Sequence, residues 1–261
     1  MKKSTSRNQV RHVGLARVLS KLGYCSRSQA GDLIRAGRVR LNGTIRRDPE
    51  SPVRIGTDRV DLDSQPLEAS RRVYFMMNKP RGIVTTACDE KGRKTVYDFL
   101  APDLPWLAPV GRLDKASEGF LLLTNDSDWA GKIMAPETHL DKTYHVQIDR
   151  VADQAFLDSM QRGVHSSDHV LRVKQVRALR SGEKNSWLEV VLDEGKNRQI
   201  RRILESLGAE VLRLIRVSVG PLQLGELPKG GTRPLTAAEK SAVDRALKLH
   251  VEQPKKMSRK A

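Results

Sequence analysis

One stretch of the chain combines a carboxylate with residues that could hold it in place. Val110–Thr124 begins with a glycine, Arg112 and Asp114, and it ends in an apolar run that predicts a buried strand. An aspartate on a loop leading into such a strand is held firmly yet stays accessible, which suits a catalytic carboxylate. The neighbouring Lys115 and Glu118 could equally make this a solvated turn of balanced charges, because ion pairs are often structural.

Two later stretches could contribute to the same chemistry. Lys142–Val146 places Tyr144 in an alternating pattern that predicts a strand. Glu194–Arg202 combines a glycine turn with a basic cluster at the start of an expected helix, for which Asn197 is the expected N-cap. Taken singly, Tyr144 could be an ordinary strand aromatic, and the basic cluster could be a solvated helix face.

The composition indicates a polyanionic partner. The 261 residues carry a formal net charge of +16, and nucleic acid is the usual partner of so basic a protein. No apolar run approaches the ~20 residues of a membrane span, and no signal core follows the basic N-terminus. Cys25 and Cys88 are the only cysteines and read as reduced thiols, so we expect a cytoplasmic protein without membrane association.

No metal or other cofactor is expected. His165 and His169 lie four residues apart, but the polar residues between them indicate a surface loop and not a ligand pair.

Residues 13–68 have the pattern of a small separate module. An apolar repeat over 15–22 predicts one helix, and Ser26 with Gln29 predicts a capping box at the start of a second. Asn42 and Gly43 then predict a hairpin, and Val53, Ile55, Val60 and Leu62 are expected in further short strands. Residues 13–47 hold eight basic residues against one acidic residue, a balance that favours contact with phosphates over a merely solvated face.

Two short helices followed by a basic Val-Arg-Leu-Asn-Gly hairpin resemble the S-four-type RNA-binding domain, an α-L module. In that family the second helix and the hairpin hold structured RNA by its shape and backbone. The resemblance implies RNA contacts for four arginines: Arg27, Arg35, Arg38 and Arg40.

The remaining chain predicts a second, larger domain. We expect a basic arm over residues 1–12, a linker over 69–72, a domain over 73–249 and a basic, disordered tail over 250–261. Expected strands are 73–77, 83–86, 120–124, 143–148, 170–176, 187–192 and 211–219, and expected helices are 95–100, 127–134, 153–162 and one from 197 to Gly208. Strands and helices do not alternate strictly, so the sequence predicts an α+β domain with a largely antiparallel sheet.

Four motifs in order resemble the RsuA/RluB/RluE/RluF family of rRNA pseudouridine synthases. They are Asn78-Lys79-Pro80 with Gly82 and Thr85, Gly111-Arg112-Leu113-Asp114 with Ser117 and Gly119, Lys142-Thr143-Tyr144, and Gly195-Lys196-Asn197-Arg198-Gln199-Ile200-Arg201-Arg202. The resemblance covers about residues 71–235, and an S-four-type module in front is usual in this family. It implies the pseudouridine synthase fold, isomerisation of uridine in rRNA, and no cofactor. We expect the large-subunit 23S rRNA as substrate, although the sequence identifies neither the uridine nor whether the small- or large-subunit rRNA is modified.

The resemblance also implies roles for individual residues. Asp114 would act as the catalytic carboxylate, either as a nucleophile or as a base on the sugar. Tyr144 would pack on the flipped uracil and serve later proton steps, and Arg112 would fill the space that the base vacates. Lys196 would be the cation beside Asp114, with Arg198 and Arg201 as alternatives between which the sequence does not choose.

Two other functions are compatible with parts of the sequence. A non-catalytic RNA-binding factor in ribosome assembly would need Asp114 or Tyr144 to be dispensable. A glycoside hydrolase would need two opposed carboxylates, such as Asp114 and Glu118, but a basic protein with 4% aromatic residues is an unusual sugar binder. We expect a monomer, since no spare apolar stripe stands out.

Overall fold

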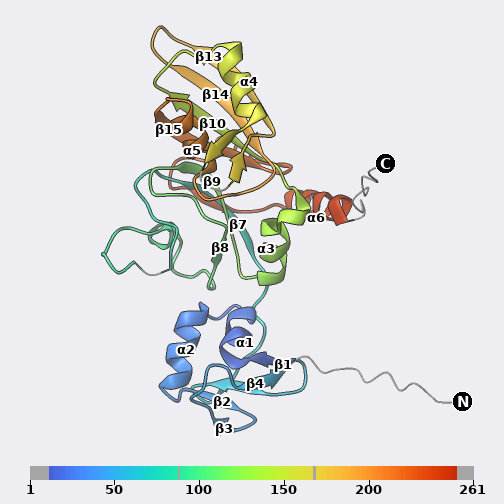
Figure 1. Cartoon of the computed structure of the whole chain (residues 1–261). Helices are drawn as coiled ribbons and strands as arrows, with labels where there is room; N and C mark the ends of the chain where they lie inside the picture. The colour runs from blue at the N-terminus through green and yellow to red at the C-terminus, as the bar shows by residue number, and fades with distance from the viewer. Residues whose placement is uncertain (1–11, 88, 167–168, 252–261) are drawn as a thin grey trace, which may run out of the picture. The chain divides into compact units, whose positions relative to one another are not determined.

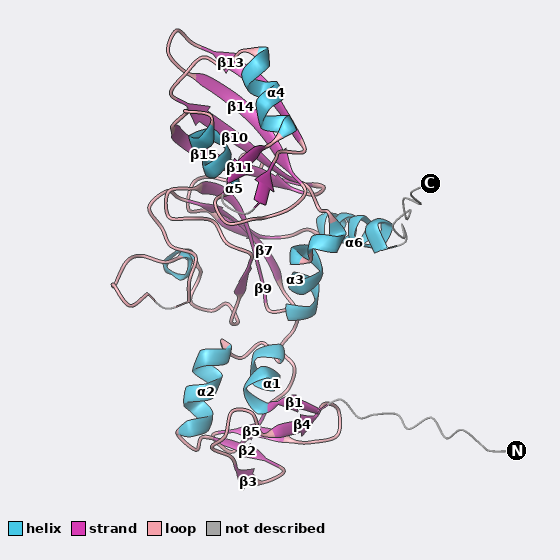
Figure 2. Cartoon of the chain, viewed as in Figure 1, coloured by secondary structure: helices cyan, strands magenta, loops and turns pink. Residues whose placement is uncertain are grey.

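The computed structural model describes residues 12–87, 89–166 and 169–251, which form two compact units. The first unit comprises the residues up to Val73 with Asp103–Ala108 and Asn125–Ser127, and the second comprises Tyr74–Pro102, Pro109–Thr124 and the residues from Asp128 onward. Helices and strands are mixed in both units (Figures 1 and 2), so the expected α+β class is confirmed. No helix in the described part of the chain has the length and apolar character that a bilayer crossing requires.

The first unit packs two helices against short strands. Helix α1 is Leu15–Lys21 and α2 is Arg27–Arg35, and α2 begins with the expected capping box between Ser26 and Gln29. One sheet has the order β3-β2-β5-β6 and a second pairs β1 with β4. The strands are β1 (His12–Gly14), β2 (Val39–Leu41), β3 (Thr44–Ile45), β4 (Pro52–Arg54), β5 (Val60–Leu62) and β6 (Gln65–Pro66).

Local sequence explains most of this unit. Asn42 and Gly43 adopt φ values of 52° and 81°, which is the left-handed conformation that a tight turn between β2 and β3 requires. Buried apolar side chains from α1, α2, β2, β4 and β5 form its core. Ile55 was expected in a strand but lies in a turn with 57% of its surface exposed, because β4 ends at Arg54.

A nine-stranded mixed sheet organises the second unit. Its main path is β13-β14-β10-β15-β9-β7-β17, with β16 paired to β15 and β8 paired to β9. Strand β9 runs parallel to β15, whereas β10 is antiparallel to both of its neighbours and β7 is antiparallel to β9. The strands are β7 (Tyr74–Lys79), β8 (Ala108–Val110), β9 (Glu118–Thr124), β10 (Lys142–Ile148), β13 (Gln175–Ser181), β14 (Ser186–Leu192), β15 (Val211–Val219), β16 (Leu222–Gln223) and β17 (Thr232–Pro234). The predicted largely antiparallel sheet is therefore confirmed.

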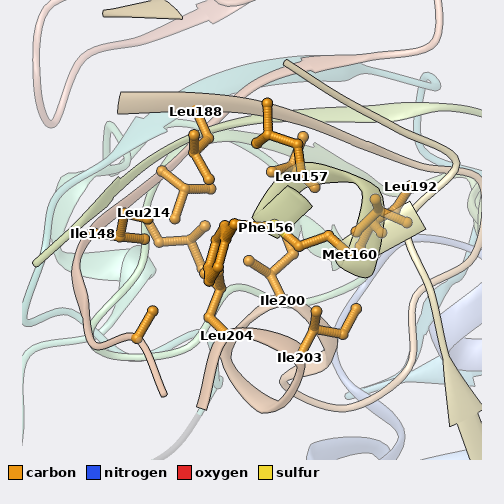
Figure 3. Close-up of a cluster of buried hydrophobic side chains, with 14 of the residues drawn as sticks. Ile148, Phe156, Leu157, Met160, Leu188, Leu192, Ile200, Ile203, Leu204 and Leu214 are labelled. Atoms are coloured by element: carbon orange, nitrogen blue, oxygen red, sulfur yellow. The ribbon is translucent and has the colours of Figure 1, made fainter. Parts of the chain in front are cut away.

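Helices cover this sheet through two apolar clusters. In the first, α4 (Gln154–Arg162) and α5 (Gln199–Ser206) pack on β10, β14 and β15. Figure 3 shows Phe156, Leu157 and Met160 of α4 facing Ile200, Ile203 and Leu204 of α5. In the second, α3 (Ser127–Met134) and α6 (Ala237–Val251) pack beside β7 and β9. The remaining elements are η1 (Val96–Phe99), η2 (Pro136–Thr138) and the hairpin of β11 (Val164–Ser166) and β12 (His169–Leu171).

Several local expectations are wrong. Residues 83–86 form no strand and make a single bridge, Val84 to Thr95, because β7 pairs with β9 and β17 instead. The expected strand over 170–176 is divided between β12 and β13, and the helix over 95–100 is a short 3-10 turn. Helix α5 has Arg198, not Asn197, at its N-cap. Helix α6 was not predicted, and it extends to Val251, inside the expected tail.

The two expected termini fall mostly on residues that the structure does not describe. Of the arm over 1–12, only His12 is described, and it begins β1. Residues 252–261 of the expected tail lie outside the described residues.

Candidate active site

Asp114 lies on the loop between β8 and β9, and several hydrogen bonds hold the backbone of this loop. The Ser117 amide donates to the Asp114 carbonyl at 3.0 Å, and the Gly82 amide donates to the Lys115 carbonyl at 2.7 Å. The Thr85 hydroxyl donates to the Leu113 carbonyl at 2.8 Å. Strand β9, which follows, is buried along its whole length. The loop is therefore fixed, while the Asp114 side chain keeps 40% of its surface exposed.

Lys79, the last residue of β7, is a buried support of this loop. Its side chain has no exposed surface, and its Nζ donates to the carbonyls of Pro80, Asp114 and Ser117 at 3.2, 3.1 and 2.8 Å. Burial lowers the pKa of this ammonium to about 8, against the attraction of Asp114 and Glu118. Lys79 belongs to the Asn78-Lys79-Pro80 motif, which by itself indicates no role for it. The sequence feature that could have indicated this supporting role is a lone lysine at the end of an apolar strand.

A cavity of about 740 Å³ opens beside Asp114. Its lining includes the β8–β9 loop with Arg112, strand β10 with Lys142 and Tyr144, residues 193–201, and the segment that holds Ile133 and Met134. Arg216 of β15 adds a further cation, and its Nε donates to the Phe120 carbonyl at 2.7 Å. The structure thus brings together Asp114, Tyr144 and the predicted basic cluster in one hollow, as the sequence motifs predicted.

The cation nearest to Asp114 is not the one that the resemblance favoured. Arg198 Nη1 lies 3.8 Å from Asp114 Oδ2, whereas Lys196 Nζ pairs with Glu194 Oε2 at 3.0 Å. Arg201 Nη2 donates to the Ala116 carbonyl at 3.2 Å. Arg198 adopts a left-handed φ of 49° at the N-cap of α5, a backbone conformation that the sequence pattern did not indicate.

Two other cations of the cavity are partly desolvated. Burial lowers the pKa of Arg201, and the positive charge of Arg198 lowers it further. Its Nε is buried and has no hydrogen-bond partner within the described residues. Burial likewise lowers the pKa of Lys142, with Arg216 adding to the effect and Asp141 opposing it. An anion or a polar substrate that enters the cavity would stabilise these charged groups, because its hydrogen bonds replace those to the water that burial has removed.

Glu118 is a structural residue and not a second catalytic carboxylate. It is 3% exposed, and Arg213 donates to both of its oxygens at 2.6 and 3.0 Å. Lys229 Nζ lies 3.2 Å from the same carboxylate. The hydrogen bonds from Arg213 hold the pKa of Glu118 below its usual range, which is the opposite of what a general acid needs. Glu118 therefore does not serve as the opposed second carboxylate that the glycoside hydrolase alternative assigned to it.

The four arginines singled out in the first unit are all exposed. Arg35 Nη1 pairs with Asp32 at 2.9 Å, Arg38 Nε donates to Asp63 at 2.9 Å, and Arg40 Nη1 donates to the Gly43 carbonyl at 3.2 Å. They lie on α2, on β2 and just before β2, which are the elements of the expected RNA-binding face. Arg27 is the first residue of α2.

Comparison with known proteins agrees with this geometry. The RNA pseudouridylate synthase family profile matches residues 73–206, and the S4 domain profile matches residues 13–60. The chain is 35% identical over 228 residues to "Ribosomal large subunit pseudouridine synthase B" of Bacillus subtilis, covering 86% of this chain and 93% of that protein. It is 36% identical to a protein of the same name from Haemophilus influenzae, covering 83% of this chain and 63% of that protein.

A solved structure shows the same fold. A crystal structure described as a pseudouridylate synthase superposes with a TM-score of 0.62 at 29% identity, covering 88% of this chain and 99% of that one. The pseudouridine synthase fold and the N-terminal S4-type domain expected from the motifs are therefore confirmed. The chain belongs to the RNA pseudouridylate synthase family.

Proposed function

We propose that this protein converts a uridine of ribosomal RNA, in the large subunit, to pseudouridine, and that Asp114 supplies the reacting carboxylate. The observation that carries the proposal is the position of Asp114, on a rigid loop at the wall of a basic cavity that also contains Tyr144. The names of the relatives from B. subtilis and H. influenzae support the large-subunit substrate. Because the substrate is rRNA, the proposal places the protein in the cytoplasm. It acts there as a monomer, in keeping with a sequence in which no spare apolar stripe stands out.

The reaction needs a carboxylate and a rotating base. The bond between N1 of uracil and C1′ of ribose breaks, the base turns, and its C5 joins C1′. The proton on C5 is then removed and N1 of the product carries a proton, so that uridine and pseudouridine have the same composition. Asp114 acts on the sugar either as a nucleophile or as a base, and Arg198, 3.8 Å away, holds the carboxylate oriented. We assign to Arg198 the place beside Asp114 that the family resemblance suggested for Lys196, and leave Lys196 to bind RNA phosphate at the cavity rim.

Access to Asp114 requires a flipped nucleotide. Extrusion of a base from folded RNA costs a few kcal/mol. Stacking on Tyr144 offsets part of this cost, at about 1–3 kcal/mol per base. Arg112, exposed on the same loop, fills the vacated space in the RNA, while Arg201 and Lys142 meet the phosphates of the flipped nucleotide.

In this proposal the first unit provides affinity for RNA. Residues 13–68 form the RNA-binding domain, residues 69–72 the linker, and residues 73–249 the catalytic domain. The exposed arginines of α2 and β2 hold the RNA backbone, which fixes position without reading sequence. They are Arg27, Arg35, Arg38 and Arg40.

Replacing Asp114 by asparagine tests the proposal. We expect Asp114→Asn to reduce pseudouridine formation in rRNA to background while RNA affinity stays nearly intact, because the amide keeps the shape but cannot act as nucleophile or base. Asp193→Asn is the matched control, since Asp193 is a second carboxylate of the same cavity. Pseudouridine mapping of rRNA from cells with and without each variant gives the readout. A wild-type rate in Asp114→Asn, or no lost site in cells without the protein, contradicts the proposal and favours a binding-only factor.

A further inference from the structure

The sheet of the second unit has a second hollow on its reverse face. Successive residues of β10 point to opposite sides, so Tyr144 lines the Asp114 cavity while His145 lines a different cavity of about 360 Å³. Strand β15 alternates in the same way, with Arg216 in the first cavity and Arg213 in the second. The reverse cavity is lined by His145, Leu179, Arg180, Trp187, Arg213 and Ile215.

Trp187 lines this reverse cavity, and two arginines lie near its ring. The Cζ atoms of Arg180 and Arg213 lie 5.3 and 5.9 Å from the centroid of its ring. Arg213 is neutralised by the buried Glu118. Arg180, on the edge strand β13, is exposed and forms no ion pair within the described residues. One guanidinium thus stacks near the indole with its charge free for an anion.

Around Trp187, no nearby carboxylate of the described residues balances the positive charge of Arg180. Glu189 is the carboxylate nearest in register, and it is already paired with Arg177 at 2.7 Å and with His145 at 3.5 Å. Leu179 lines the same cavity as Trp187 and is 37% exposed. The reverse face therefore combines apolar surface with excess positive charge. Aromatic side chains and arginine planes are the usual platforms for unpaired bases, and the arginines meet the phosphates.

We propose that this reverse face binds an unpaired nucleotide of the substrate RNA, with the base against Trp187 and the phosphate at Arg180. The inference rests on the proposed function and adds a second RNA contact, on the opposite side of β10 from Asp114. The positive charge favours RNA over a protein partner. The cavity lies at the small end of ligand sites, a size that suits one base and not a helix of another protein.

The first experiment locates the contact. A single-stranded oligonucleotide carrying 5-iodouridine is bound to the full-length protein and irradiated, and the crosslinked peptides are mapped by mass spectrometry. We expect a crosslink at Trp187 in addition to those near Tyr144. Crosslinks confined to the Asp114 cavity and the first unit overturn the proposal.

The second experiment measures the strength of the contact. We expect Trp187→Leu to weaken binding of an oligouridylate by about fivefold or more, which is the effect of losing one stacked base. Arg180→Ala should lower the slope of log affinity against log salt by about one. Because Arg180 is exposed on an edge strand, this variant tests the site even if Trp187→Leu fails to fold. Arg245→Ala, exposed on α6, is the control and should leave both quantities unchanged.

The outcomes separate this inference from the proposed function. On an rRNA fragment with unpaired flanks, Arg180→Ala should raise KM and leave kcat unchanged. If Arg180→Ala changes neither the affinity, nor the slope of log affinity against log salt, nor KM, the inference is overturned. The reverse face would then be better suited to a protein partner. If the wild-type protein makes no pseudouridine but Arg180→Ala still weakens oligonucleotide binding, the proposed function fails while the reverse-face contact stands.

Discussion

Lys79 shows how a single residue can determine the geometry of the Asp114 loop. Its ammonium has no exposed surface and connects three carbonyls, two of which belong to Asp114 and Ser117 on the loop itself. A buried charge is costly, and the three acceptors offset only part of that cost, since burial still lowers the pKa of Lys79 to about 8. Lys79 therefore positions Asp114 through the backbone, without touching its carboxylate.

Replacing Lys79 by methionine should destabilise the second unit and disable the site. The substitution removes one donor from each of three carbonyls, of which that of Asp114 keeps the Ser117 amide. We expect a loss of about 2–5 kcal/mol in the free energy of unfolding, as for other broken buried polar networks. Pseudouridine formation should fall more than RNA affinity does, because the loop carrying Asp114 loosens. Chemical unfolding at pH 7 and a single-turnover assay measure the two effects. Wild-type stability would contradict the role given to Lys79.

The deprotonation of Lys79 should also contribute to the pH dependence of stability. The folded pKa of Lys79 is about 8, below the ordinary value of 10.5, so between these values the unfolded chain binds the proton and the folded chain has released it. Stability therefore rises with pH across this window, by at most about 1.4 kcal/mol per pH unit from this group. The Met variant lacks this contribution. Unfolding titrations from pH 7.5 to 9.5 should show a more positive slope in the wild-type protein than in Lys79→Met, and equal slopes would exclude the shifted pKa.

At the scale of elements, the contact between β9 and β15 holds the two halves of the sheet together. This parallel pairing covers only two residue pairs, Glu118 with Ile215 and Gly119 with Arg216. Gly119 has a φ of 102°, and a Cβ there would lie 2.3 Å from the Arg216 carbonyl oxygen and 2.9 Å from its nitrogen. The close approach of the two backbones requires glycine at this position.

Gly119→Ala should therefore force β9 away from β15. We expect a loss on the order of 3 kcal/mol in the free energy of unfolding, from backbone collision together with positive-φ strain. Gly208→Ala is the matched control, because Gly208 has a φ of 69° but open space around its Cβ position. It should cost only about 1–2 kcal/mol of conformational strain. Equal losses in the two variants, measured by chemical unfolding, would show that the collision with Arg216 is relieved elsewhere.

The elements also show what sequence patterns can and cannot predict. Strand β9 and the capping box of α2 were predictable, since an apolar run and a Ser-x-x-Gln spacing are local signals. Residues 83–86 look like a strand, but Thr85 instead exchanges hydrogen bonds with Leu113, 28 residues away. Arg198, which lies 3.8 Å from Asp114, adopts a left-handed φ that the sequence pattern did not indicate. Contacts of this kind depend on tertiary structure, which no local pattern encodes.

At the scale of the whole molecule, charge and chemistry are carried by different units. The first unit has its own apolar core and presents exposed arginines on α2 and β2, while the second contains Asp114 and its cavity. With a net charge of +16, binding should release counterions from the RNA, so affinity must fall steeply with salt. Individual arginines of the first unit should contribute to this slope without altering the chemical step.

Arg27→Ala tests this division of roles. Arg27 is exposed at the first position of α2, and we expect its removal to weaken rRNA binding and to lower the slope of log affinity against log salt by about 0.7–0.9. KM should rise while kcat stays unchanged, since Arg27 belongs to the unit without Asp114. Arg59→Ala is the control, because Arg59 Nε is already bonded to Asp61 at 2.7 Å and lies in the acidic part of the same unit. If the two variants lower the salt slope equally, or if Arg27→Ala lowers kcat, then phosphate contact is not concentrated on α2 and the two units do not act independently.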